Sequence, residues 1–192
     1  DWHWDFDTGN GDLGNQGIHQ MDLARWALGQ EGLPSRTISV GGRLGYDDDG
    51  NTPNSQIVWH DYGGAPLLFE VRGLPRDQAA QGADWGKSMD DYMGARIGVI
   101  VHCEGGTLRI PDYTRAIAYD TEGKEIRRFE GATDHFANFV AAVRSRRPED
   151  LHADVEQGHV SSALCHLGNV SHRLGAAADE RDIAAALDGR AF

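Results

Sequence analysis

The sequence is poor in cysteine and contains no long apolar run. Its two cysteines, Cys103 and Cys165, form neither a Cys-x-x-Cys pair nor a zinc-ligand pattern, which excludes a disulfide scaffold or a zinc finger. We expect two reduced and mostly buried thiols. No segment approaches the roughly 20 apolar residues that a transmembrane helix needs. The 192 residues are therefore expected to form one soluble globular domain.

Positive charge is also scarce. The chain has 18 lysines and arginines against 30 aspartates and glutamates, which gives a formal net charge of −12. Nucleic acids and acidic membranes bind basic surfaces, so we expect neither kind of partner.

A dinucleotide-binding turn is missing as well. Residues 9–14 fit the letters G-x-G-x-x-G, but residues 2–7 before them are aromatic and polar, not a β-branched strand. Without that strand, the glycines indicate a tight turn that enters a helix.

Histidines are scattered without the spacing of metal ligands. His159, His166 and His172 are seven and six residues apart, which does not place three imidazoles around one ion. No Ser-His-Asp pattern or nucleophile elbow is present. We expect no metal site.

Hydrophobic periodicity and turn residues predict an α+β fold. Helices are expected at 17–28, 134–147 (capped by Thr133 or Asp134) and 150–174, and strands at 36–44, 56–62, 66–72, 97–103, 106–110, 116–120 and 125–129. Most consecutive strands are joined by short turns, which favours antiparallel pairing. We expect residues 56–129 to form one open-faced antiparallel sheet with helices on one face, within a single domain over residues 1–192.

The most distinctive segment that is present is the first helix. Asn15, His19, Asp22 and Trp26 follow the spacing i, i+4, i+7 and i+11, which places them on one stripe. Such a stripe is costly in an apolar core, so we expect it to face a wet pocket. His19 suits general base catalysis because histidine titrates near neutral pH. Asp22 either orients the imidazole or forms an ion pair with Arg25.

At these residues the chain resembles the glucose–fructose oxidoreductase, inositol dehydrogenase and rhizopine-catabolism (Gfo/Idh/MocA) family. The catalytic helix of that family reads D-x-G-x-H-x-x-D. Gly17, His19 and Asp22 match it, whereas Asn15 replaces the first Asp. The resemblance extends over residues 2–175, through runs at 39–43, 69–73, 135–139 and 161–164.

The resemblance implies the C-terminal domain of an NAD(P)-dependent oxidoreductase that transfers hydride from a sugar, polyol or related hydroxy compound. NAD or NADP would be bound mainly by an N-terminal Rossmann domain that is absent from this chain. We expect the catalytic residues His19 and Asn15 and the substrate-binding residues Trp2, Trp4, Asp12 and Asp22. The family also implies a homodimer or tetramer formed through the open sheet face, and we expect a cytoplasmic location.

Two alternatives stay open. Some relatives use bound NAD transiently to cleave glycosidic bonds. The chain could also be a non-catalytic dimerisation or binding module of the same fold. Asn15 favours this last reading, because Asn hydrogen-bonds but does not carry the charge of Asp.

The missing phosphate-binding turn leads to a first prediction. The isolated chain should bind NAD(H) and NADP(H) only weakly, because no strand–turn–helix unit is expected to hold the pyrophosphate. Isothermal calorimetry is the measurement. Low-micromolar binding would place a cofactor site within this chain and contradict the domain assignment.

Overall fold

A computed structural model describes residues 2–45, 47–77, 79–80 and 88–187. The helical elements are η1 (Trp2–Trp4), α1 (Gly11–Asn15), α2 (Gly17–Ala27), α3 (His135–Ser145), η4 (Pro148–Asp150), α4 (Val155–Leu174) and α5 (Glu180–Leu187). The strands are β1 (Arg36–Gly42), β2 (Ser55–Asp61), β3 (Leu67–Arg72), β4 (Val99–Cys103), β5 (Gly106–Asp112), β6 (Arg115–Tyr119) and β7 (Glu125–Glu130).

The named strands form two antiparallel sheets and not the single sheet expected from the sequence. One sheet has the order β1-β2-β3 and the other has the order β4-β5-β6-β7. Short turns produce the predicted hairpins within each sheet. Residues 73–98 separate β3 from β4, and a connection of that length imposes no hairpin pairing. The predicted α+β class and antiparallel pairing are confirmed, whereas the prediction of one sheet over residues 56–129 was wrong.

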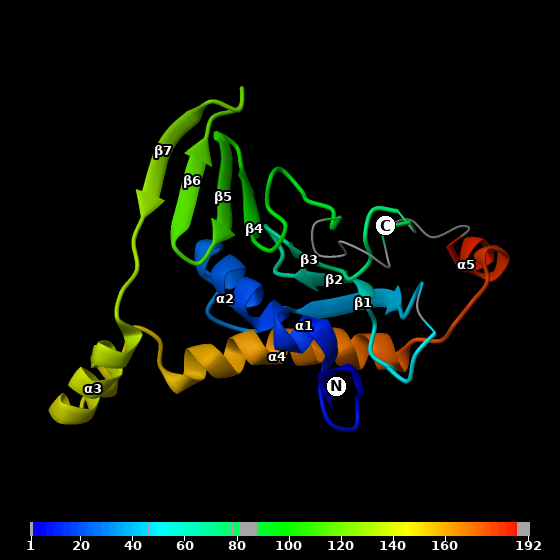
Figure 1. Ribbon diagram of the computed structural model, residues 1–192, viewed down its shortest axis with the longest axis horizontal. Coiled ribbons are helices and arrows are strands. Elements are labelled where there is room, and N and C mark those ends of the chain that lie inside the picture. Colours follow the sequence, from blue (N-terminus) through cyan, green and yellow to red (C-terminus); the bar gives the residue numbers. More distant parts are fainter. Residues whose placement is uncertain (1, 46, 78, 81–87, 188–192) are drawn as a thin grey trace.

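The helices lie on one side of the three-stranded sheet. Figure 1 shows α1 and α4 below it and α2 at its left-hand end, with the four-stranded sheet rising away from one end of α2. Helix α4 packs on β1 and β2, and α2 contacts both β3 and β4. Helix α2 is therefore shared by the two sheets.

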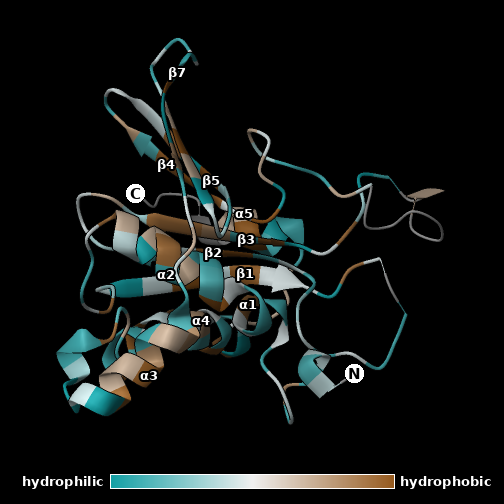
Figure 2. Ribbon diagram, turned by 60° about the vertical axis from the view of Figure 1, so that its left-hand side comes forward, coloured by the Kyte–Doolittle hydropathy of each residue, from teal (hydrophilic) through white to brown (hydrophobic). Residues whose placement is uncertain are grey.

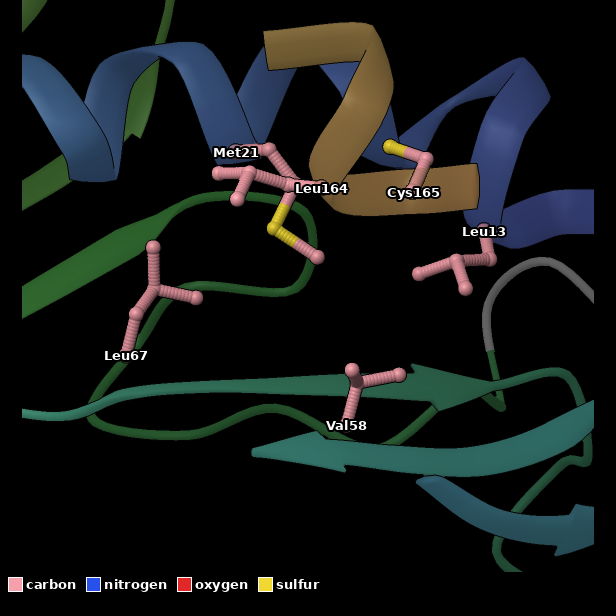
Figure 3. Close-up of a cluster of buried hydrophobic side chains, with 6 residues drawn as sticks. All are labelled: Leu13, Met21, Val58, Leu67, Leu164 and Cys165. Atoms are coloured by element: carbon pink, nitrogen blue, oxygen red, sulfur yellow. The ribbon is translucent and has the colours of Figure 1, made fainter. Parts of the chain in front are cut away.

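A small hydrophobic core joins this helix layer to the sheet. Figure 3 shows its side chains, which come from α1, α2, β2, β3 and α4: Leu13, Met21, Val58, Leu67, Leu164 and Cys165. Gly168 allows α4 to approach closely, because a Cβ added there would lie 2.8 Å from Cδ2 of Leu13 and 3.1 Å from both methyl carbons of Val58.

The same layer contains a buried histidine. His60 on β2 has no exposed surface. Its Nδ1 lies 2.9 Å from Oγ1 of Thr37, and its Nε2 has no hydrogen-bond partner in the described part of the chain. Burial lowers the pKa of His60 to about 4, because the charged imidazolium would lose its hydration.

The opposite face of the three-stranded sheet is open and apolar. Ile38, Val40, Ile57 and Leu68 are exposed there, and Trp59 is half-exposed and paired with Ile38 and Leu68 on the flanking strands. Figure 2 shows brown, hydrophobic stretches on these strands. The expected open face is therefore present, and it is not polar.

Both cysteines are free, as predicted. Burial raises the pKa of the Cys165 thiol to about 12, whereas Cys103 is exposed at the end of β4. The prediction of buried thiols was wrong for Cys103, which is the last residue of β4 and leads directly into the hairpin turn to β5. None of the described helices is long and apolar enough to span a bilayer.

Two glycines of α4 offer a matched test of the packing. Gly158→Ala should raise the free energy of unfolding by up to about 1 kcal/mol, since alanine favours the helix and a Cβ there meets open space. Gly168→Ala gains the same propensity but overpacks the core, so we expect a net loss of about 1–2 kcal/mol. Urea denaturation of both variants measures the difference. Equal effects of the two substitutions would contradict the close approach of α4.

His60 should make stability depend on pH. The unfolded state takes up a proton near the ordinary pKa of 6.5, whereas the folded state resists protonation down to about 4. Stability should therefore fall as the pH drops through this window, by about 3 kcal/mol, since one pKa unit corresponds to about 1.4 kcal/mol.

Denaturation at stepped pH values tests this expectation in a His60→Gln variant. That variant should lose most of the pH slope between 4 and 6.5. A His159→Gln control, at an exposed position of α4, should keep it. An unchanged slope in His60→Gln would assign the pH dependence to other groups.

Candidate functional site

The predicted polar stripe is divided in the structure. Asn15, His19 and Trp26 lie on the solvent side of the first two helices, whereas Asp22 turns toward α4. Asn15 ends α1, Gln16 alone separates α1 from α2, and His19 is the third residue of α2. Asn15 and His19 are exposed, and Trp26 is 78% exposed. These three side chains avoid the core, whereas the wet pocket expected in front of the stripe stays a prediction.

His19 lies beside a tyrosine from the four-stranded sheet. The Tyr113 ring meets the His19 imidazole edge-on, with 5.4 Å between centroids and 63° between planes. The Tyr113 hydroxyl accepts hydrogen bonds from Nε2 of Gln16 at 2.6 Å and from Nε2 of Gln20 at 3.4 Å. We call Gln16, His19, Gln20 and Tyr113 the Tyr113 cluster.

The turn that carries Tyr113 is fixed by Asp112. One oxygen of this carboxylate accepts bonds from the backbone N–H of Thr114 at 2.9 Å and from its hydroxyl at 2.8 Å. The other accepts from Nε of Arg115 at 2.7 Å. Hydrogen bonds from Arg115 and then Thr114 lower the pKa of Asp112 to about 2, so the carboxylate stays charged at neutral pH. The turn therefore presents Tyr113 to α2 in one orientation.

The aromatic N-terminal segment is attached to α1. Nε1 of Trp4 donates to Oδ1 of Asp12 at 3.3 Å. The Trp4 carbonyl accepts from the backbone N–H groups of Asn51 at 3.0 Å and Thr52 at 3.2 Å. Trp2, in the same turn of 3-10 helix, is largely exposed. Three of the predicted substrate-binding residues, Trp2, Trp4 and Asp12, are thus held near the start of α1.

Asp22 faces α4, away from this arrangement. Its Oδ1 accepts from Oγ of Ser161 at 2.6 Å and lies 3.5 Å from Nη2 of Arg25. Arg25 is buried and also donates to Oε1 of Gln157 at 2.7 Å. Of the two roles open for Asp22, the structure shows the ion pair with Arg25.

Sequence reasoning missed Tyr113, Gln16 and Gln20. The two glutamines are spaced i, i+4 on either side of His19, which was a usable signal for a shared helix face. Tyr113 gave no such signal in the sequence, since it lies in the β5–β6 turn, far along the chain from α2. No group of three potential metal ligands occurs within the described residues.

No family model and no curated protein matches this sequence. Solved structures do match. The WlbA dehydrogenase of Bordetella pertussis, in complex with NADH and UDP-GlcNAcA, has a TM-score of 0.59 at 17% identity, over 91% of this chain and 46% of that one. A protein of Thermotoga maritima classed as an oxidoreductase gives 0.58 at 17% identity, over 83% of this chain and 44% of that one.

The chain has the fold of these oxidoreductases. The WlbA dehydrogenases belong to the Gfo/Idh/MocA family, so the resemblance seen in the sequence is confirmed at the level of the fold. The chain spans about half of the length of each of these structures, at 44% and 46%. The matched part is consistent with their C-terminal domain.

The glycine of the family motif has a packing role in this fold. A Cβ added to Gly17 would lie 2.9 Å from Cζ of Phe69 on β3. The first turn of α2 therefore approaches the sheet through Gly17. His19, two residues later, points to the other side and remains exposed.

Proposed function

We propose that this chain is the substrate-side domain of an NAD(P)-dependent oxidoreductase that acts on a sugar, polyol or related hydroxy compound. The observation that carries the proposal is His19, an exposed residue of α2 that lies beside Tyr113 of the β5–β6 turn. The fold around it is shared with dehydrogenases. In this function the unprotonated His19 imidazole accepts the hydroxyl proton, and the carbon that bears the hydroxyl loses a hydride, for which bound NAD(P) would be the acceptor.

The glycine-rich segment at residues 9–14 does not fit a dinucleotide. Residues 9–14 follow the 3-10 helix η1 and not a β-strand, and α1 has only five residues. The strand–turn–helix unit that binds a pyrophosphate is therefore not formed there. We propose that NAD or NADP is held by a dinucleotide-binding portion outside this chain.

The exposed apolar side of helix α3 is an argument for such a dinucleotide-binding portion. Its apolar side chains Phe136, Phe139, Val140 and Val143 are all exposed. Figure 1 shows α3 set apart from both sheets. A contiguous exposed apolar stripe of this kind marks a contact with further protein. We propose that the dinucleotide-binding portion packs on it.

The aromatic segment near α1 supports a carbohydrate as substrate. Trp2 offers an exposed indole, and the Asp12 carboxylate lies beside the Trp4 indole, a combination suited to stacking on a sugar ring and accepting from its hydroxyls. The WlbA dehydrogenases with the same fold are bound to UDP-GlcNAcA.

Substitution of His19 tests the proposed function. In the full-length protein, His19→Ala should lower kcat by about 10²- to 10⁴-fold, the range for loss of a positioned base. His19→Asn should be nearly as inactive, because an amide does not accept the proton. Reduction of NAD or NADP with a panel of sugars and polyols that includes UDP-GlcNAcA is the assay.

Two controls accompany this assay. His159→Ala, at an exposed position of α4, should leave turnover unchanged, and Asn15→Asp should preserve or raise it. Thermal unfolding of the His19 variants should match the wild type, because the residue is exposed. Normal turnover and normal KM in His19→Ala would overturn the proposed role.

We also propose that the open sheet face forms a homodimer. Replacing two adjacent exposed residues, in Ile57→Lys with Leu68→Lys, should convert the dimer to a monomer in analytical ultracentrifugation, because buried unpaired charges oppose association. Val155→Lys, at a residue 87% exposed elsewhere, is the matched control and should stay dimeric. A wild-type chain that is monomeric at high concentration would contradict this interface.

A further inference from the structure

The hydroxyl oxygen of Tyr113 accepts two hydrogen bonds within the Tyr113 cluster, and the hydroxyl proton takes part in neither of them. A phenolic oxygen donates one hydrogen bond and accepts others. Nε2 of Gln16 and Nε2 of Gln20 both donate to this oxygen, at 2.6 and 3.4 Å. Tyr113 is 61% exposed, so its O–H group can reach a ligand in the solvent space beside α2.

The cluster holds this donor in a fixed direction. Gln20 is only 6% exposed, and its Oε1 accepts from Nε2 of Gln16 at 3.2 Å. The amide groups are thereby oriented with their N–H groups toward Tyr113. Together with the turn fixed by Asp112, this arrangement positions the phenol before any ligand arrives. Groups oriented in advance bind without a further ordering cost.

We infer that Tyr113 is a substrate-binding residue that donates a hydrogen bond to a second oxygen, next to the hydroxyl that His19 deprotonates. This inference rests on the proposed function of His19. The two rings are in edge contact, so their polar atoms can engage neighbouring oxygens of one ligand. The cluster therefore selects a vicinal diol, as found in sugars and polyols, over an isolated alcohol. Tyr113 keeps its proton throughout, and the substrate proton passes to His19.

Binding of two simple compounds to this chain tests the inference. The probes are trans-1,2-cyclohexanediol, which has adjacent hydroxyls, and cyclohexanol, which has one. The chemical shifts of the His19 imidazole report binding of each. Tyr113→Phe removes only the phenolic oxygen of an exposed side chain. It should weaken diol binding by about five-fold, the effect of one hydrogen bond, and leave cyclohexanol binding within about two-fold.

Tyr92→Phe is the matched control. Tyr92 also lies beside a histidine, with its hydroxyl 3.3 Å from Nε2 of His102, but outside the cluster. This variant should bind both compounds as the wild type does. The amide and methyl spectrum of each variant checks that the fold is retained, and Gln16→Met, which removes the shorter bond to Tyr113, should also reduce the preference for the diol.

The possible results separate the inference from the proposed function. If His19 responds to both compounds and Tyr113→Phe binds them as the wild type does, the role of Tyr113 is overturned and that of His19 stands. If His19 responds to neither compound at the limit of solubility, the proposed function fails and the inference fails with it. Weaker diol binding with unchanged cyclohexanol binding in Tyr113→Phe, and not in Tyr92→Phe, supports both.

Discussion

The close approach of α2 and α4 to the three-stranded sheet is the constraint on which the rest of this structure depends. Gly17 brings the first turn of α2 against Phe69, and Gly168 brings α4 against Leu13 and Val58. A Cβ at either position would force a neighbouring side chain to shift. Because α2 is held to the sheet by one side, its opposite side is left to carry His19 and Trp26.

A buried arginine then fixes how α2 is rotated. Arg25 donates from Nε to Oγ of Ser161 at 3.1 Å and from Nη1 to the carbonyl of Gln30 at 2.8 Å, and it pairs with Asp22. A buried cation needs such partners, since an unpaired one would be strongly destabilising. The need to satisfy Arg25 explains why Asp22 is directed toward α4 and not toward the imidazole of His19.

The candidate site joins helix α2 to the four-stranded sheet. Helix α2 contacts β3 on one side and β4 on the other, and the β5–β6 turn brings Tyr113 back to the same helix. The four-stranded sheet therefore contributes a side chain to the site in addition to any role in assembly. A shared fold does not by itself assign an activity, so the chemistry of these side chains carries the functional argument.

The sequence alone determined the features that depend on neighbours along the chain. The helix around His19 follows from its periodicity, the hairpins from their short turns, and the start of α3 from Asp134, whose side chain accepts from the N–H of Ala137 at 2.9 Å. Of the predicted site, Asn15, His19 and the Trp4–Asp12 pair lie near one another in sequence.

Only the tertiary structure decided how distant segments meet. It separated the strands into two sheets, exposed Cys103, joined Asp22 to Arg25 and Ser161, and placed Tyr113 against His19. Local signals end at each turn or long connection, because helix capping, turn chemistry and periodicity act over a few residues. Which side chains face each other across those connections is set by the packing of the whole chain, and that packing has no signature in the spacing of residues.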